Sequence, residues 1–389
     1  MSLFAFGDDD LARLAERHGT PAFVYSAAVA RAGLQRLRAA LPERVRLAYA
    51  VKANPHPDLL RLFADLGASF DCASEGELRR VAGLAPGRVF FAGPGKRTAE
   101  LALALEQGVR VQAEGWEDLE RLDALARAPV AVNLRVHPAA GVAESNRIIG
   151  GVGPSAFGVD EEALPDVLPR AAALTHVRVR GLHVFAASNE RDAAKLLATH
   201  RMVLDLGRRL TEQHGLDLEQ IDLGGGLGVP YAPGEAPLDV DALGRGLGDL
   251  LREHAWFRGE LILEPGRFLA APCGVYLARV VRTKESRGTR FAILEGGVNH
   301  LLRPLLTGQA FPVRAVGRAV GRAVGRDGPT AATTLAGPLC TSLDRLGTVD
   351  LPDLRPGDLL AFGTAGAYGF TEGMTHFLSH PVPPEVWVA

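Results

Sequence analysis

The sequence is poor in cysteine and carries no excess of charge of either sign. Only three of its 389 residues are cysteines, Cys72, Cys273 and Cys340, too few and too scattered for a disulfide framework or a metal cluster of the usual spacing. The 43 lysines and arginines nearly balance the 45 aspartates and glutamates, which leaves a formal net charge of -2. We therefore expect no metal site, no nucleic-acid partner and a reducing compartment.

Long apolar runs are missing as well. No stretch approaches the length that a membrane span requires. The N-terminal stretch MSLFAFGDDDLARLAERHG lacks the positive charge and the continuous apolar core of a signal peptide. These absences predict a soluble, cytoplasmic protein without a membrane partner.

What the sequence does contain is a regular alternation of short apolar segments and amphipathic helical patterns, from Val45 to about Leu269. This alternation indicates a parallel sheet covered by helices. The expected strands are residues 45–51, 69–72, 89–92, 109–112, 130–136, 177–185, 220–223 and 261–264, and the clearest helices are 57–66, 75–81, 116–125 and 193–210. Strands in this number and order favour a closed (β/α)8 TIM barrel, with an open doubly wound sheet as the alternative.

The pattern changes after Leu269. The segments GVYLARVVRTKESRGTRFAILEGG, TTLAGPLC and DLLAFGT are typical of strands separated by glycine-rich turns. Two domains are expected for a chain of this length. We predict a barrel domain over residues 26–270 and a β-rich barrel or sandwich domain over 271–389, which residues 1–25 join through their strand-like PAFVY.

A perfect tandem repeat, AVGR in three copies, runs from Ala315 to Arg326. Such regularity is typical of a recent duplication in a surface loop. The functional alternative is an arginine patch that binds an acidic carrier protein or a phosphorylated group.

The polar residues at the expected strand ends indicate where chemistry takes place, because the active site of a TIM barrel lies at the carboxyl ends of its strands. Lys52 closes the apolar run RLAYAVK, where loss of hydration favours a neutral amine able to form a Schiff base. The alternative is a lysine that extends into solvent. The other polar residues at these ends are Asp71, Arg135, His137, His183, Ser188, Gly224, Gly225, Gly226, Glu264 and Arg267.

Two of these segments suit a phosphorylated pyridine. The run GGGLG offers backbone N–H groups with no Cβ in the way, which allows close approach of a phosphate. A carboxylate at Glu264 would keep a pyridine nitrogen protonated, and Arg267 could pair with the phosphate. The alternatives are a tight turn at the glycines and a surface salt bridge between the two charged residues.

Six motifs follow one another along the chain: YAVKANPHPDLL, FDCASEGEL, IDLGGGLG, LEPGRFL, GPLCTSLDRLG and GAYG. Together they resemble the fold-type III pyridoxal-phosphate decarboxylases that act on diaminopimelate, ornithine and arginine. The resemblance covers nearly the whole chain. It implies pyridoxal 5'-phosphate as cofactor, an amino-acid decarboxylase activity and a homodimer with shared active sites.

The resemblance also implies roles for single residues. Lys52 looks like the lysine that binds the cofactor aldehyde, and Glu264 like the partner of the pyridine nitrogen. Cys340 resembles the cysteine that reaches into the neighbouring subunit's site and delivers a proton after CO2 leaves, a task that suits a thiol near neutral pH; without the resemblance it would be a small buried residue. Further residues are implied near the lysine and a cofactor oxygen, Asp71 and Arg135, and at the phosphate, Gly224, Gly225, Gly226, Ser188, Arg267 and Tyr368.

The chain departs from the family at the ring-stacking position. Where family members carry the second histidine of GLHCHIGSQ, this chain has Phe185 in GLHVFAASNE. An aromatic face can still stack on the cofactor ring, although it neither titrates nor donates a hydrogen bond. We therefore expect Phe185, and not His183, to stack on the cofactor; the alternative is that Phe185 belongs to the core.

The expected substrate contacts are Arg303, Thr341 and Asp344. Thr341 stands where enzymes for basic amino acids carry a carboxylate. Diaminopimelate enzymes present RP-x-LY, whereas the line here is Arg303-Pro304-Leu305-Leu306-Thr307, without the tyrosine. A second ammonium on the substrate would lose its hydration here without compensation. The wording GPLCTSLD and FLSHPVPPEV resembles the branch that serves siderophore, carrier-linked or other specialised pathways, so we expect a conjugated amino acid as substrate.

Three other functions stay open. The first is a diaminopimelate decarboxylase of lysine biosynthesis. The second is an amino-acid racemase, whose resemblance implies a lysine and a tyrosine on opposite ring faces and usually an arginine at the pyridine nitrogen, where this chain has Glu264. The third is a non-catalytic pyridoxal-phosphate-binding protein, which would be shorter and lack the β domain with Cys340.

Overall fold

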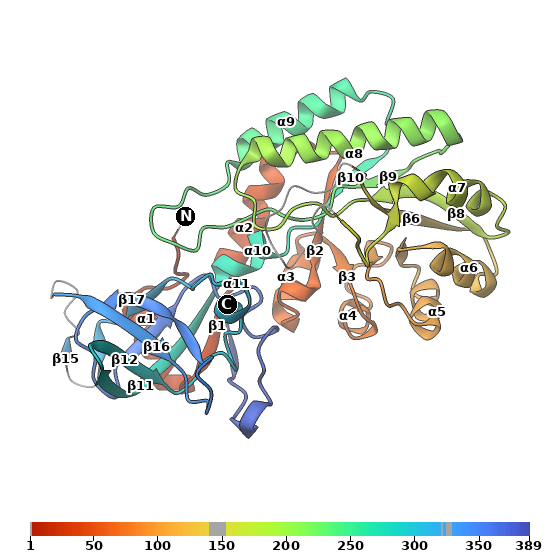
Figure 1. Ribbon diagram of the computed structural model, residues 1–389. Helices are drawn as coiled ribbons and strands as arrows, with labels where there is room; N and C mark the ends of the chain where they lie inside the picture. The colour runs from red at the N-terminus through yellow and green to blue at the C-terminus, as the bar shows by residue number, and fades with distance from the viewer. Residues whose placement is uncertain (1, 140–152, 320–321, 324–328) are drawn as a thin grey trace. The chain divides into compact units, whose positions relative to one another are not determined.

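The computed structural model describes residues 2–139, 153–319, 322–323 and 329–389, and Figure 1 shows its ribbon. The chain forms two compact units. The barrel unit comprises Gly33–Gly228 and Leu238–Gly266, and the β unit comprises Met1–Ala32, Val229–Pro237 and Arg267–Ala389.

Parallel strands close into a ring in the barrel unit. They are β2 Val45–Ala50, β3 Ser69–Cys72, β4 Val89–Phe91, β5 Arg110–Ala113, β6 Val130–His137, β8 Val177–His183, β9 Gln220–Asp222 and β10 Glu260–Leu263. Neighbours pair in the order β5-β4-β3-β2-β10-β9-β8-β6, and β5 also pairs with β6, which closes the ring. The predicted TIM barrel is confirmed, and the open sheet is excluded. A short strand β7, Val159–Asp160, pairs with the end of β6.

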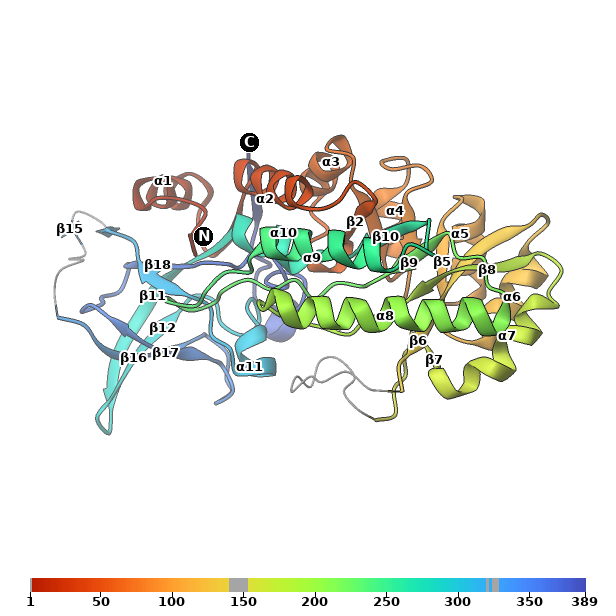
Figure 2. The ribbon, with the colours of Figure 1, turned by 90° about the horizontal axis from the view of Figure 1, so that it is seen from above.

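Helices follow most of these strands. They are α3 Pro57–Asp65, α4 Glu75–Val81, α5 Thr98–Glu106, α6 Trp116–Leu125, α7 Leu164–Ala172, α8 Ala193–His214 and α9 Val240–Glu253, while α2 Ala27–Ala40 precedes β2. Helix α3 buries Leu59, Leu62 and Phe63, three residues of its predicted apolar face. The side chains of Ser74 and Asp192 accept backbone N–H groups at the starts of α4 and α8, which fixes where these helices begin. Figures 1 and 2 both show α8 and α9 lying side by side.

The β unit is built on a mixed sheet. Its strands are β1 Ala22–Ser26, β11 Gly274–Ser286, β12 Thr289–Leu294, β13 Val313–Ala315, β16 Ala331–Ala336, β17 Arg345–Leu351, β18 Leu359–Phe362 and β19 Glu385–Val388. The order is β13-β18-β11-β12-β16-β17, with β1 antiparallel to β11 and parallel to β19. The helices of this unit are α1 Asp8–His18 and the short α10 Arg267–Ala270 and α11 Arg303–Thr307. A β-rich second domain is thereby confirmed, and α1 is an element that the sequence analysis did not predict.

The AVGR repeat lies partly outside the described residues. Within it, β14 Arg318–Ala319 pairs antiparallel with β15 Arg322–Ala323. The alternative interpretation, an arginine patch, concerns side chains that lie outside the described ones. Among the described residues, no helix combines the length and the apolar character of a membrane span.

Candidate active site

Lys52 lies in a short 3-10 turn, η1 Val51–Ala53, directly after β2. Its Nζ is 3.4 Å from Oδ2 of Asp71 and 5.6 Å from the centre of the Phe185 ring, and its side chain is 41% exposed. Asp71, at the end of β3, is 1% exposed. Burial and the charge of Glu264 raise the pKa of Asp71 to about 7, against the opposing effect of Lys52. An accessible amine thus stands between a buried carboxyl group and an aromatic face.

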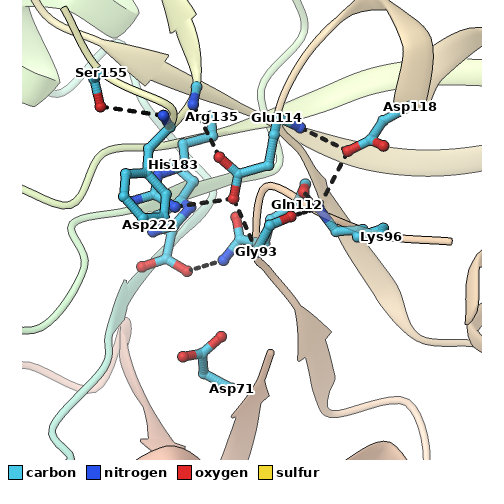
Figure 3. A network of polar contacts seen from close by, with 12 residues as sticks. Asp71, Gly93, Lys96, Gln112, Glu114, Asp118, Arg135, Ser155, His183 and Asp222 are labelled. Carbon is cyan, nitrogen blue, oxygen red and sulfur yellow. Dashed lines mark hydrogen bonds and ion pairs between the residues drawn. The ribbon is translucent and has the colours of Figure 1, made fainter. Parts of the chain in front are cut away.

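Lys96, the other lysine that follows a barrel strand closely, has a different environment. The chain has four lysines, and Lys96 comes after β4. Its Nζ donates to the carbonyl oxygens of Gly93 and Gln112, each at 2.7 Å, and to Oδ2 of Asp118 at 3.2 Å (Figure 3). All three donors of this ammonium are used within the fold. Lys52, by contrast, keeps 41% of its side chain accessible beside Asp71.

A polar layer lies inside the barrel below Lys52. Nε2 of Gln112 donates to Oδ2 of Asp222 at 2.7 Å and to Oε1 of Glu264 at 3.3 Å. Nε2 of His183 is 3.6 Å from Oε1 of Glu264. Figure 3 shows Gln112, His183 and Asp222 converging from β5, β8 and β9. Burial pushes the pKa of Glu264 upward, but the effects of His183, Lys52 and a hydrogen bond with Asp222 bring it to about 2.

Two members of this layer, Gln112 and Asp222, were not predicted as functional. Gln112 belongs to β5 and Asp222 to β9, so only closure of the barrel brings them together. The available signal was the placement of each polar residue at the end of an apolar strand, the same criterion that selected Asp71. His183, which was not expected to stack on a cofactor, is held beside Glu264 instead.

Arg135 is held by a carboxylate at the same end of the barrel. Its Nη1 donates to Oε1 of Glu114 at 2.9 Å, and its guanidinium lies 4.6 Å from the Phe157 ring. The same carboxylate accepts the N–H groups of Gly93 and Gly158, each at 2.9 Å (Figure 3). Glu114 therefore fixes Arg135 against two loops at once.

The glycine run after β9 allows close approach of the backbone. Gly224 and Gly226 have φ values of 69° and 93°, which residues other than glycine rarely adopt. A Cβ on Gly225 would stand 2.7 Å from the carbonyl oxygen of Glu264, and one on Gly226 would stand 2.6 Å from Cβ of Ala187. The N–H of Glu190 donates to the carbonyl of Gly226 at 2.8 Å. The segment around Ser188 thus runs beside the glycine run, as a phosphate loop formed by both requires.

The β unit gathers a second polar group around Tyr231. Nη1 of Arg267 donates to the Tyr231 hydroxyl at 2.9 Å, and its guanidinium lies 4.6 Å from the Tyr368 ring. The guanidinium of Arg303 lies 5.1 Å from the Tyr231 ring. Arg267 and Tyr368, both predicted at the phosphate, are therefore neighbours. Tyr231 was missed because nothing in its local sequence distinguishes it from other loop tyrosines.

Arg303 has hydrogen-bonding capacity to spare. It is 2% exposed, and Nη2 donates to Oε1 of Gln309 at 2.9 Å, while Nε and Nη1 are buried without a hydrogen-bond partner. Burial raises the pKa of Glu372, and the charges of Arg303 and Arg267 partly offset that rise. A buried cation with open donors fits a polar ligand group.

Cys340, Thr341 and Asp344 lie on one loop of the β unit. The Cys340 thiol is exposed, whereas those of Cys72 and Cys273 are buried. The two oxygens of Asp344 accept the N–H groups of Val298 and Leu339, each at 2.8 Å. Asp344 thus anchors the loop that presents Cys340 and Thr341.

The donor set fits pyridoxal 5'-phosphate. In the barrel unit, the fold brings an accessible amine, a facing aromatic ring and a buried ionised carboxylate to one end of the strands, next to a glycine loop with N–H groups. An aldehyde, an aromatic ring, a pyridine nitrogen and a phosphate are the groups that such residues bind. Lys52, Asp71, Phe185 and Glu264 are brought together in the barrel unit, and Arg267, Tyr368 and Arg303 in the β unit.

Comparisons with known proteins point the same way. Residues 28–271 match the family described as pyridoxal-dependent decarboxylase, pyridoxal binding domain. The chain is 33% identical over 391 residues to the L-glutamyl-[BtrI acyl-carrier protein] decarboxylase of Niallia circulans, across 97% of this chain and 90% of the relative. It is 36% identical over 387 residues to the diaminopimelate decarboxylase of Pseudomonas aeruginosa, across 95% and 90%. The crystal structure of diaminopimelate decarboxylase from Helicobacter pylori complexed with L-lysine is similar with a TM-score of 0.88 at 26% identity, covering 97% of this chain and 94% of that one.

Proposed function

This chain belongs to the family of pyridoxal-dependent decarboxylases, and from that premise we propose that it removes CO2 from an amino acid carried in a larger conjugate, such as an aminoacyl group on a carrier protein. The activity requires pyridoxal 5'-phosphate. When bound, this cofactor supplies an aldehyde that joins the substrate amine and a ring that accepts the electron pair left behind by CO2. The protein supplies binding, orientation and proton delivery.

In the barrel unit, we assign the aldehyde to Lys52. Asp71 lies 3.4 Å away and orients its amine, and the Phe185 face supports the ring. Glu264 would hold a proton on the pyridine nitrogen, because a carboxylate with a pKa of about 2 stays ionised at neutral pH. Arg135, which Glu114 holds at 2.9 Å, would bind a cofactor oxygen.

We assign the phosphate to the glycine run and Ser188 of the barrel unit, and to Arg267 and Tyr368 of the β unit. Backbone N–H groups at a glycine loop bind phosphate without displacing side chains. Arg267 adds a positive charge, and Tyr231 holds its guanidinium at 2.9 Å. The proposed phosphate residues are Gly224, Gly225, Gly226, Ser188, Arg267 and Tyr368.

We assign proton delivery to Cα to Cys340. A thiol is a weak, movable acid, and this one is exposed on a loop that Asp344 anchors. The assignment requires a homodimer in which the cysteine of one protomer serves the site of its partner. The homodimer and the cytoplasmic location stay predictions.

The substrate class rests on one observation above all: Thr341, and no carboxylate, follows Cys340. An ammonium at the far end of the substrate would have no counter-charge there. Arg303 offers open donors that suit a carbonyl or a carboxylate. We therefore assign Arg303 and Thr341 to the far end of the substrate and give Asp344 the task of holding their loop in place. The similarity to a decarboxylase of a carrier-linked glutamyl group supports the same class.

Decarboxylation of free diaminopimelate is the second candidate, favoured by the 36% identity to the Pseudomonas aeruginosa enzyme. A direct test incubates the purified, cofactor-loaded protein with L-glutamate, an L-glutamyl thioester of an acyl-carrier protein, meso-diaminopimelate, L-lysine and L-ornithine, and measures CO2. We expect the thioester to react with a kcat/KM at least about tenfold above every free amino acid. The fastest turnover with diaminopimelate would establish the second candidate instead, and loss of optical activity without CO2 would indicate a racemase.

A further inference from the structure

Two carboxyl groups inside the barrel lie too close together for both to be charged. Asp222 is 0% exposed and Glu264 is 3% exposed. The nearest polar atoms of Asp222, Glu264 and His183 all lie within 4.8 Å of one another. Lys52, whose charge lowers the pKa of Glu264, pairs with Asp71 at 3.4 Å. Two buried carboxyl groups as close as Asp222 and Glu264 favour sharing a proton, because repulsion between them is not screened by water.

The contacts of the pair decide which group holds that proton. Glu264 is flanked by the Gln112 amide at 3.3 Å and the His183 ring at 3.6 Å, and its charge is also favoured by Lys52. Asp222 accepts the Gly224 N–H at 2.9 Å and the Gln112 amide at 2.7 Å, both neutral donors. Burial and the charge of Glu264 raise the pKa of Asp222 well above its usual range. The proton therefore belongs on Asp222, and the charge on Glu264.

We propose that Asp222 is a positioning residue that stays protonated at neutral pH, donates a hydrogen bond to Glu264 and thereby keeps Glu264 an ionised carboxylate. The inference rests on the proposed role of Glu264 at the pyridine nitrogen. Asp222 itself touches neither cofactor nor substrate in this proposal. It acts through Glu264, and Gln112 bridges the two side chains. Figure 3 shows the contact between Gln112 and Asp222.

Other titratable groups surround the pair from several strands. His183 faces Glu264 from β8, Asp71 stands at the end of β3, and Lys52 lies in the turn after β2. Beyond His183 lie the charges of Arg135 and Glu114. Burial lowers the pKa of His183, and the charge of Glu264 opposes that effect.

Variants of the cofactor-loaded enzyme test the assignment. Asp222→Ala removes the donor, so we expect kcat to fall on the order of tenfold with little change in KM, and the acid limb of the kcat profile to move to higher pH. Asp222→Asn keeps a neutral donor and should recover most of this loss. If Asp222 were ionised instead, the asparagine would delete a charge beside Glu264, and Asp222→Asn would be as damaging as Asp222→Ala, which would overturn the proposal.

Infrared spectroscopy tests the proton directly. With 13C-labelled aspartate, the wild-type enzyme at pH 7 should show the carbonyl absorption of protonated side-chain carboxyl groups. Asp71, with a pKa of about 7, also contributes to it, and Asp222→Asn should remove the component that belongs to Asp222. Asp118→Asn is the matched control, because Asp118 is equally buried but pairs with Lys96 at 3.2 Å and Arg121 at 2.7 Å. This control should leave the band unchanged. An unchanged band in Asp222→Asn would contradict a protonated Asp222.

Glu264→Gln separates this inference from the proposed function. If Glu264→Gln kept full activity, the assigned role of Glu264 would be wrong whatever the state of Asp222. If Glu264→Gln lost activity but the infrared band of Asp222 were missing in the wild type, only the further inference would fail.

Discussion

Two buried aspartates, Asp344 of the β unit and Asp222 of the barrel unit, have different roles. In the β unit, the two oxygens of Asp344 accept the N–H groups of Val298 and Leu339. A single carboxylate therefore orders a loop, and both of its oxygens have a hydrogen-bond donor. In the barrel unit, Asp222 also accepts two hydrogen bonds, from Gly224 and Gln112, but it lies within 4.8 Å of Glu264, a second buried carboxyl group. The first arrangement serves folding. The second costs folding free energy, and the difference indicates where the chain keeps groups for chemistry.

The largest expected effect comes from removing the Lys52 amine, which tests whether the barrel unit keeps groups for chemistry. Lys52→Ala should lower decarboxylation on the order of 10³-fold or more, because the oriented covalent attachment of the cofactor is lost. Lys195→Ala, which removes an exposed lysine 3.8 Å from Glu190, should leave the rate unchanged. CO2 release at saturating cofactor measures both. Comparable rates in the two variants would refute the assignment.

Burial of a histidine should also make the stability of the barrel unit sensitive to acid. His200 in α8 is 1% exposed, and burial lowers its pKa to about 4. The folded state then binds this proton less readily than the unfolded state, so stability is complete above pH 6.5 and is lost as the pH falls toward 4, by about 3 kcal/mol. His200→Leu should abolish that loss.

Chemical unfolding at pH 8, 6 and 4 measures the effect, with His18→Gln as an exposed control. If the pH dependence of His200→Leu matched that of the wild type, the burial argument for this histidine would be wrong.

The three cysteines differ in the same way: Cys340 is exposed and assigned to proton delivery, whereas Cys72 and Cys273 are buried. Cys340→Ala should lower kcat on the order of 10²-fold through loss of an oriented proton donor. Cys273→Ala should change activity by less than twofold, because burial raises the pKa of the Cys273 thiol to about 12 and leaves it inert near neutral pH. Steady-state kinetics on both variants decides the matter. Equal effects would mean that exposure of Cys340 has no part in the reaction.

The loop that carries Cys340 gives the smallest expected effect. Asp344→Asn replaces an acceptor of two N–H groups by an amide that accepts at one atom only, so the free energy of unfolding should fall by roughly 1–3 kcal/mol. For Asp350→Asn, on the exposed face of β17, the free energy of unfolding should fall by less than about 0.5 kcal/mol. If Asp344→Asn kept full stability but lost substrate affinity, Asp344 would contact the substrate as first predicted from the sequence.

The sequence predicted the barrel well because its strands and helices carry their periodicity locally. The expected helices 75–81 and 116–125 coincide with α4 and α6, and the strands deviate by a few residues at most. Helix α1 is not predicted because the N-terminal stretch is considered only as a possible signal peptide. The family resemblance, the cofactor and the decarboxylase activity are confirmed by the matching family and relatives.

The site could be predicted only in part. Lys52 and Glu264 end apolar strands within recognisable motifs, so their positions could be read directly. Gln112 and Asp222 could not be predicted as site residues, because their role depends on a 2.7 Å contact between β5 and β9. These strands are more than a hundred residues apart in the sequence. The contacts of Asp344 could not be foreseen either, since the N–H groups that it accepts come from residues 298 and 339.

The covalent attachment of the cofactor to Lys52 can be tested most directly with borohydride, which fixes the cofactor irreversibly to the amine that holds it. With four lysines in the chain, peptide mapping by mass spectrometry distinguishes every candidate. The account predicts a pyridoxyl group on Lys52 alone. A pyridoxyl group on Lys96, Lys195 or Lys284, or on no lysine at all, would contradict it.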